Sequence, residues 1–329
     1  MNTFDAEITV RPKTLDWVNR HLDRGECVVE AEPLRGGMTA EVRRLTIGTG
    51  DTVTRHLVLR SFVDSFYLEN AEDWLNREAG ALTLLAGTSV LAPELVAVDP
   101  TAAWCEYPSL LMTHLEGRPV LDDEGIETRA PLLARQLVAI HALRPAERPQ
   151  RFRTLTMAES VVIPKGGDAT VWDAAINVIR EPAPPYEGRF LHRDFQPGNV
   201  LFDVSPSSPT RARITGVVDW SQPSWGPADL DVAHCCTNLA LLHDPSWGLR
   251  FAEAYEEAGG VPATAASERL FWLVRDALSC SEEVELWARA YQGAGRTDLT
   301  TSILERRLDA YVTSLMNALG SCSWSDAGG

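Results

Sequence analysis

The segment RFLHRDFQPGNVLF, residues 189–202, decides the fold of this chain. Apolar runs at both ends flank a polar loop, which carries Asp194 and, after four intervening residues, Asn199. A carboxylate such as that of Asp194 can accept the proton of a hydroxyl group or orient that hydroxyl. The Pro-Gly turn before Asn199 would bring its amide oxygen back toward a metal ion, since Mg²⁺ binds oxygen ligands. The loop therefore predicts a site in which a base and a metal ion act on the hydroxyl group of a bound molecule.

A second acidic residue follows downstream. The run GVVDW ends an apolar strand with Asp219, twenty residues after Asn199, which suits a charged metal ligand. Phosphoryl transfer from MgATP needs a carboxylate near the attacking hydroxyl, ligands for the metal and donors for the developing charge. In the alternative interpretation, Asp194 and Asn199 are turn residues and Asp219 caps a strand. The spacing H-x-D-x4-N, with a strand and aspartate downstream and a β-rich half upstream, favours the catalytic interpretation.

The part of the chain before this loop is rich in strand patterns. Residues 26–62 predict three strands separated by glycine turns, and ELVAVD and SLLMTHL predict two more. A helix is expected at 70–86, with Asn70 as its N-cap and Glu78 on or beside its apolar stripe. A charge in that place is costly unless it is paired. This half is therefore expected to form a mostly antiparallel sheet with one helix.

The rest of the chain is largely helical. Apolar residues recur at helical spacing in three segments: 130–143, 266–279 and 304–319. Residues 144–188 are rich in proline and weakly periodic. We therefore expect an α+β fold with two lobes, a β-rich N-terminal domain over 1–115 and a mainly helical C-terminal domain over 116–329. Ligands usually bind at such domain boundaries.

Composition and charge limit the partners. With 46 acidic and 30 basic residues the formal charge is −16, which disfavours nucleic acid and anionic membranes and would attract a cationic small molecule. A surplus of acidic residues on the surface is also common in proteins simply because it increases solubility. The first residues contain no apolar signal segment, no apolar run approaches the about 20 residues that span a bilayer, and the six cysteines form no CxxC pair. We expect a cytoplasmic monomer or homodimer with reduced thiols, and neither nucleic acid nor membrane as a partner.

Two motifs together, HRDFQPGNVLF and VVDWSQPSWGPADLDVA, resemble the aminoglycoside phosphotransferase family, a branch of the protein-kinase-like fold that phosphorylates small molecules. Weaker matches occur in the family's order along most of the chain. GGMTAEVRRL is similar to its nucleotide-covering hairpin, VLR to its third strand, NREAGALTLL to its helix with a paired glutamate, and LLMTHLEG to its hinge. The resemblance implies a bilobal protein-kinase-like fold, with ATP or GTP and Mg²⁺ as cofactors.

The resemblance also implies a role for each matched residue. Asp194 would be the catalytic base, and Asn199 and Asp219 the magnesium ligands. The hairpin residues Gly36, Gly37 and Thr39 would cover the phosphates. The ion pair of Arg60 with Glu78 would hold them. The hinge residues Met112, Thr113, His114 and Leu115 would bind the nucleotide base.

Two positions depart from the family pattern. Arg60 stands where the family usually has a lysine, and only two of the 30 basic residues are lysines, so the exchange fits the chain's compositional bias. The alternative is that Arg60 is a solvated residue of an edge strand. The stretch GGMTAE is also not GxGxxG, which leaves the backbone geometry over the phosphates open.

Three features argue against a protein substrate. Asp231 follows Asp219 by only twelve positions, which leaves no room for a long phosphorylatable loop. Arg193 therefore has no phosphorylated loop to bind, and Gln196 replaces the lysine that is usual two residues after the catalytic aspartate.

Two histidines are both expected to be structural: His192, which lies in an apolar strand, and His141, which lies on an apolar helix face.

The acceptor site is expected in the helical domain. Four acids lie close to Trp272 and Trp287, a composition that suits a cationic sugar or amine; they are Asp276, Glu282, Glu283 and Glu285. Gln196 is a further candidate contact. The alternative is a solvated helix face with tryptophans in the core.

The leading functional hypothesis is an ATP- and Mg²⁺-dependent O-phosphotransferase that acts on a hydroxyl of a small cationic molecule, such as an aminoglycoside or related antibiotic. A metabolic kinase of choline, homoserine or a sugar derivative would use the same residues. The non-enzyme alternative is a kinase-like module that binds nucleotide without turnover.

Overall fold

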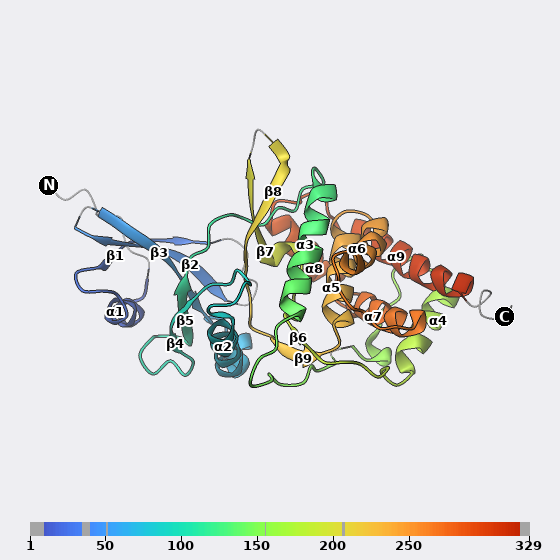
Figure 1. Ribbon diagram of the computed structural model, residues 1–329, viewed down its shortest axis with the longest axis horizontal. Helices are drawn as coiled ribbons and strands as arrows, with labels where there is room; N and C mark the ends of the chain where they lie inside the picture. The colour runs from blue at the N-terminus through green and yellow to red at the C-terminus, as the bar shows by residue number, and fades with distance from the viewer. Residues whose placement is uncertain (1–9, 35–39, 51, 155, 206–207, 323–329) are drawn as a thin grey trace. The chain divides into compact units, whose positions relative to one another are not determined.

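The computed structural model describes residues 10–34, 40–50, 52–154, 156–205 and 208–322. The chain divides into two compact units, Met1–Glu116 with Gly216–Gln222, and Gly117–Thr215 with Pro223–Gly329 (Figure 1). The short segment that contains Asp219 therefore groups with the β-rich unit, although it lies far beyond residue 115. No helix within the described ranges combines the length and the apolar character needed to cross a bilayer.

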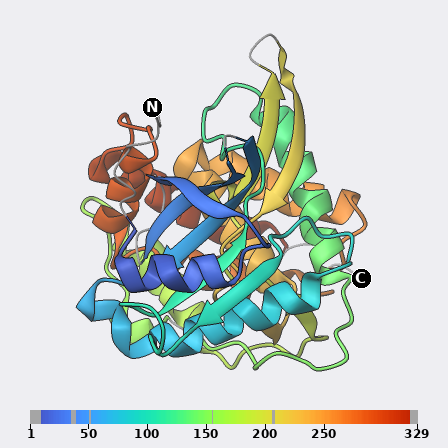
Figure 2. The ribbon, with the colours of Figure 1, turned by 90° about the vertical axis from the view of Figure 1, so that its left-hand side faces the viewer.

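The first unit is built on a five-stranded antiparallel sheet with the order β1-β2-β3-β5-β4 (Figure 2). Its strands are β1 (Cys27–Pro33), β2 (Glu41–Thr49), β3 (Thr52–Ser61), β4 (Leu95–Asp99) and β5 (Ser109–Thr113). All five strands that the sequence predicts in this half are therefore confirmed. In the register of β3 against β5, Arg60 lies opposite Leu110.

Helix α1 (Pro12–Arg20) covers one face of this sheet. Trp17 packs in one cluster with alternate strand residues such as Leu45 on β2 and Leu57 on β3. Because Leu59 belongs to the same cluster, the alternation of side chains along β3 places Arg60 on the opposite face. The expectation of a single helix in this half was wrong, because α1, nine residues long, is a second helix.

Helix α2 (Ser65–Leu85) packs against strands β4 and β5. It begins before the predicted helix at 70–86, and its N-cap is Asp64, whose carboxylate accepts a hydrogen bond from the backbone N–H of Phe66. The prediction of Asn70 as the N-cap was therefore wrong. The first turn is solvated, with Phe66 78% exposed, so its residues carry no apolar periodicity to reveal a helix.

The second unit is mainly helical (Figure 1). Its helices are α3 (Ile126–His141), α4 (Ala169–Arg180), α5 (Asp229–Leu242), α6 (Pro245–Glu257), α7 (Ala266–Ser279), α8 (Val284–Gly293) and α9 (Thr301–Cys322). Helix α5 packs against α6, α7 and α9 and is buried along nearly its whole length. Burial on nearly all sides is expected of a helix at the centre of such a bundle.

Short strands in the second unit hold the loop with which the sequence analysis began. Strand β6 (Arg189–Leu191) pairs with β9 (Ser224–Gly226), and β7 (Val200–Ser205) pairs with β8 (Ser208–Val217). Between β6 and β7 lies the Asp194 loop, residues 192–199, which ends in a 3₁₀ turn. Leu191, the last residue of β6, packs with residues of α5 and α7, so both helices anchor the start of this loop.

Candidate active site

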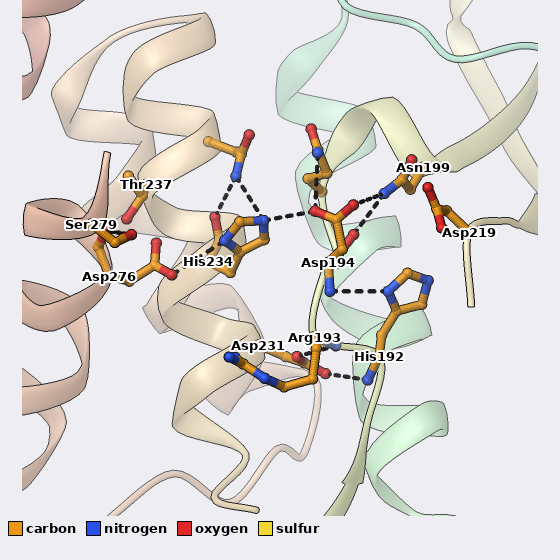
Figure 3. A network of polar contacts seen from close by, with 12 residues as sticks. His192, Arg193, Asp194, Asn199, Asp219, Asp231, His234, Thr237, Asp276 and Ser279 are labelled. Atoms are coloured by element: carbon orange, nitrogen blue, oxygen red, sulfur yellow. Dashed lines mark hydrogen bonds and ion pairs between the residues drawn. The ribbon is translucent and has the colours of Figure 1, made fainter. Parts of the chain in front are cut away.

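Asp231 on α5 fixes the backbone at the start of the Asp194 loop. Its carboxylate is fully buried and accepts hydrogen bonds of 2.8 Å each from the backbone N–H groups of His192 and Arg193 (Figure 3). Arg193 has a φ of 75°, a strained conformation for a residue with a side chain. The two hydrogen bonds hold this turn and thereby set the direction in which Asp194 leaves the strand.

His141 on α3 supports Asp231 in turn. Its Nε2 lies 3.2 Å from Asp231 Oδ2, and its Nδ1 lies 2.7 Å from the hydroxyl of Tyr255. A hydroxyl that donates to Nδ1 leaves the ring proton on Nε2, where it can be donated to the carboxylate. Both expected structural histidines are buried, and His141 is in addition one member of this hydrogen-bonded chain.

The charge on Asp231 should stabilise the fold in a pH-dependent way. Burial alone would raise the pKa of Asp231, but hydrogen bonding and attraction by His141, together with His192 and Arg193, lower it below its ordinary value of 3.8. A lowered folded-state pKa contributes stability that is present above the unfolded pKa and lost as the pH falls through the folded one.

Asp231→Asn is therefore expected to lower the free energy of unfolding by roughly 3 kcal/mol at neutral pH, because the amide removes the charge that binds two N–H groups. The difference between wild type and variant should shrink below about pH 4. Urea unfolding at a series of pH values measures it. A difference that stays constant down to pH 3 would contradict a charged Asp231.

Asp194 and Asn199 lie close together in the loop (Figure 3). The amide nitrogen of Asn199 donates to Asp194 Oδ2 at 2.7 Å and to the Asp194 backbone carbonyl at 2.8 Å. The amide oxygen is thus the end of Asn199 that a metal would take. Gln196 donates from Nε2 to Asp194 Oδ1 at 3.2 Å, and the Asp194 side chain remains 34% exposed. A carboxylate held on both oxygens yet open to solvent can receive an acceptor hydroxyl.

His234 contacts the same carboxylate, and the sequence analysis did not find it. Its Nε2 lies 3.0 Å from Asp194 Oδ1, and its Nδ1 lies 3.2 Å from Asp276 Oδ1 on α7 (Figure 3). His234 follows Asp231 by three positions, so both side chains project from the same side of α5 toward the loop. The spacing D-x-x-H at the start of a helix would have been the signal.

The first unit contains a buried ion pair that the sequence predicts. Arg60 Nη1 lies 3.0 Å from Glu78 Oε2 and 3.2 Å from Oε1, and both side chains are less than a tenth exposed. The same Nη1 donates to Asp219 Oδ1 at 3.0 Å. Arg60 is therefore not a solvated edge residue, and the donors that could reach a phosphate are Nη2 and Nε, the latter buried without a hydrogen-bond partner among the described residues.

Electrostatics keep Arg60 charged. Burial alone would lower the pKa of its guanidinium, but the neighbouring carboxylates of Asp219 and Glu78 raise it above its ordinary value. Asp219 has a φ of 63°, and its Oδ1 also accepts a hydrogen bond from Ser221 Oγ at 2.7 Å. Carboxylate oxygens such as those of Asp219 are ligands of the type that Mg²⁺ prefers.

The hinge residues lie at the end of β5. The N–H of Thr113 donates to the Glu94 carbonyl at 2.9 Å, and that of His114 donates to the His56 carbonyl at 3.2 Å. These two N–H groups are engaged in hydrogen bonds to neighbouring backbone carbonyls. Leu115 is therefore the hinge residue whose N–H could donate to a nucleotide base. Met112 pairs with Val58 and Leu95. Gly36, Gly37 and Thr39, which the resemblance assigns to the phosphates, lie outside the described residues.

The acidic residues expected to bind the acceptor fall into two groups. Asp276 has a side chain only 12% exposed and faces His234 rather than solvent. Glu282, Glu283 and Glu285 are exposed around the first turn of α8, where acidic residues also favour the helix dipole. Trp272 is a core residue, as the alternative interpretation expected, while Trp287 is half-buried with its ring 6.2 Å from that of His234.

Comparison with known proteins gives concordant results. Residues 30–270 match the model of the phosphotransferase enzyme family. No curated protein matches the chain. A putative aminoglycoside phosphotransferase from Ralstonia eutropha JMP134 is 16% identical, with a TM-score of 0.57 over 91% of this chain and 98% of that one.

Two further solved structures contain bound ligands. A ternary complex of a thermostable APH(4)-Ia mutant with ADP and hygromycin B is 17% identical, with a TM-score of 0.54 over 88% of this chain and 95% of that one. The GDP and kanamycin complex of APH(2'')-IIIa is 17% identical, with a TM-score of 0.53 over 85% and 92%. These likenesses show that the predicted bilobal, protein-kinase-like α+β fold is correct.

Proposed function

Because the chain belongs to the phosphotransferase enzyme family and is a small-molecule phosphotransferase that acts on a hydroxyl group, we propose that it transfers the γ-phosphoryl group of ATP to a small cationic molecule, an aminoglycoside or related antibiotic. The observation that carries this proposal is the Asp194 loop. Its carboxylate is held on both oxygens by Asn199, Gln196 and His234 and is still a third exposed.

In the proposed reaction, Asp194 Oδ2 accepts the proton of the acceptor hydroxyl. The acceptor oxygen forms a bond to the γ-phosphorus while the bond from that phosphorus to the bridging oxygen breaks, and ADP leaves. Such transition states are loose, so the carboxylate also contributes by orienting the hydroxyl. Oδ2 accepts one hydrogen bond, from Asn199, and a carboxylate oxygen has a second lone pair for this proton.

The chemistry of the two assigned residues fits magnesium, since Asn199 and Asp219 each carry oxygen ligands. Asn199 offers its amide oxygen because its nitrogen donates to Asp194, and Asp219 would contribute a carboxylate oxygen. Bound Mg²⁺ would neutralise charge on the phosphates. Arg60, held by Glu78, would contact the α- and β-phosphates through Nη2.

The remaining roles follow from the same assignment. Residues 1–115 would cover the nucleotide, with Gly36, Gly37 and Thr39 over the phosphates and the N–H of Leu115 on the base. Residues 116–329 would bind the acceptor. GTP is the alternative phosphoryl donor, since one similar structure is a GDP complex.

Charge supports a cationic acceptor. The chain carries a formal charge of −16, and Glu282 and Glu283 are exposed acids in the helical unit. Hygromycin B and kanamycin are bound in the two similar complexes, and both proteins share the fold of this chain. Asp276 contributes to this site less directly than expected, because its carboxylate binds His234.

A coupled ADP-release assay tests the proposal. Wild-type protein is incubated with ATP or GTP, with and without Mg²⁺, and with a panel of aminoglycosides, other antibiotics, choline, homoserine and sugars. We expect Mg²⁺-dependent turnover with at least one aminoglycoside, lost on chelation. Turnover of only choline, homoserine or a sugar would replace the acceptor class with a metabolic one. Nucleotide binding without turnover of any acceptor would support the non-catalytic module instead.

A further inference from the structure

Helix α5 places a histidine between two carboxylates. His234 Nε2 lies 3.0 Å from Asp194 Oδ1, and Nδ1 lies 3.2 Å from Asp276 Oδ1 (Figure 3). A carboxylate oxygen accepts hydrogen bonds and does not donate them when it is ionised. Both ring nitrogens are therefore satisfied together only when both carry a proton.

A second neighbour of the ring leads to the same assignment. The amide nitrogen of Asn238 lies 3.3 Å from His234 Nε2 and could donate to it only if Nε2 were unprotonated. An unprotonated Nε2 would direct its lone pair at the Asp194 carboxylate only 3.0 Å away. Asn238 has other partners, since it donates to the His234 carbonyl at 2.9 Å and accepts from the Tyr291 hydroxyl at 2.9 Å. The proton therefore belongs on Nε2.

We propose that His234 is a positioning residue, held as an imidazolium by Asp276, that fixes the carboxylate of Asp194 for phosphoryl transfer. The inference rests on the proposed function of Asp194 as the base. It also gives Asp276 a different role from the one expected from the sequence, because this carboxylate orients a ring rather than contacting the acceptor.

The hydrogen bonds on Asp194 show how the positioning works. Oδ1 is contacted by His234 Nε2 and by Gln196 Nε2 at 3.2 Å, and Oδ2 is contacted by Asn199 Nδ2 at 2.7 Å. Donors on both oxygens fix the rotation of the carboxylate about its Cβ–Cγ bond. A reacting group that is displaced by about 1 Å loses rate steeply, so this fixation affects catalysis.

Charge explains why a cation is needed at this position. Asp194 and Asp276 lie on opposite sides of one ring, and two carboxylates near each other in a partly buried place repel. An imidazolium between them forms a charge-assisted hydrogen bond with each, which is about twice as strong as a neutral one. If the ring were neutral, the repulsion between the two carboxylates would remain, and one of the two hydrogen bonds would be lost.

The titration of the ring agrees with this geometry. Burial alone would lower the pKa of His234, but attraction by Asp276 and hydrogen bonds to Asp194 and Asp276 raise it to about 10. Burial raises the pKa of Tyr291 on α8, Tyr311 on α9 and Cys280 after α7, so these groups remain neutral. Asp194 and Asp276 are the acids whose carboxylates contact the ring.

The kinetic test compares His234→Leu with His234→Gln. Leucine removes both donors, so kcat at neutral pH should fall by about 10- to 100-fold, with KM for ATP and for the acceptor within about 2-fold of wild type. Glutamine can still donate to Asp194 and should recover part of the loss. His243→Leu is the matched control, because His243 is also buried and hydrogen-bonded to an acid, Asp123, but does not contact Asp194. It should retain wild-type kcat.

The protonation test uses Asp276→Asn. Loss of this charge lowers the pKa of His234, so ring deprotonation and the accompanying decline in kcat should move down by at least about one pH unit from wild type. Nuclear magnetic resonance of histidine labelled with ¹³C and ¹⁵N, with the His234 signal assigned from the His234→Gln spectrum, measures the ring directly and needs no turnover.

The outcomes separate this inference from the proposed function. Wild-type kcat in His234→Leu, or a ring that is neutral at pH 8 in the wild-type protein, would overturn the inference even if the enzyme phosphorylates its acceptor. If no acceptor is turned over, the proposed function fails, and the ring titration alone decides whether the imidazolium exists. If His234→Leu does not fold by circular dichroism, His234→Gln and the titration decide.

Discussion

Replacing Asp194 by asparagine is expected to lower kcat by about 10²- to 10⁴-fold, because an amide cannot accept the proton of the acceptor hydroxyl. The substitution keeps the size of the side chain, and Asp194 is a third exposed, so the fold should remain intact. The KM for ATP should change little, since Asp194 is assigned to the acceptor and not to the nucleotide. Initial rates of ADP release at saturating ATP and acceptor measure the loss.

The chain offers a matched control for this variant. Asp203 lies on β7 a few residues after the Asp194 loop, with its side chain 62% exposed and a surface contact to Arg213 at 3.2 Å. Asp203→Asn makes the same chemical change away from the site and should keep wild-type kcat. Equal rates for wild type and Asp194→Asn would remove the base from the mechanism.

The second large effect concerns the ion pair of the first unit. Arg60→Met leaves Glu78 buried without a cation, which is expected to lower the free energy of unfolding by about 3–5 kcal/mol. Loss of the guanidinium should also lower kcat/KM by about 10²- to 10³-fold, because donors to the phosphates are removed. Arg55→Met on the same strand is the control. Arg55 pairs with Asp23 and Glu26 near the surface, and such pairs contribute about 1 kcal/mol or less.

A double variant separates the structural role of Arg60 from its proposed contact with phosphate. In Arg60→Met/Glu78→Leu both buried charges are replaced by apolar groups, so stability should return to near that of wild type. Activity should remain low, since no cation is left to hold the phosphates. Recovery of wild-type kcat/KM together with stability would mean that Arg60 only neutralises Glu78.

Strongly periodic elements of the fold were predictable from the sequence. The five strands of the sheet and helices α3, α7 and α9 show alternation or helical spacing, and the structure has all of them. Helix α5 was not predictable in this way, because DLDVAHCCTNLALL is buried on nearly every side, its polar residues included, and so has no exposed face to reveal a period. Helix α6 has an Asp244 cap and Pro245 at its first position, which are signals that a periodicity search alone overlooks.

The site was predictable only where its residues are neighbours in the sequence. The short spacing from Asp194 to Asn199 marks one loop, and Glu78 attracts attention as a charge on an apolar stripe. His234 reaches the loop from α5 and Asp276 reaches His234 from α7, so their convergence depends on how the two helices pack. In the sequence, Asp276 is indistinguishable from the surface acids that follow it.

Transfer of ³²P from the γ-position of ATP tests the central claim most directly. Wild-type protein and Asp194→Asn are incubated with labelled ATP, Mg²⁺ and the aminoglycoside that supports the fastest ADP release, and acceptor and inorganic phosphate are separated. We predict label in the acceptor for wild type, at a rate equal to ADP release, and a rate about 10²- to 10⁴-fold lower for the variant. Label only in inorganic phosphate, or equal transfer by both proteins, would contradict the account.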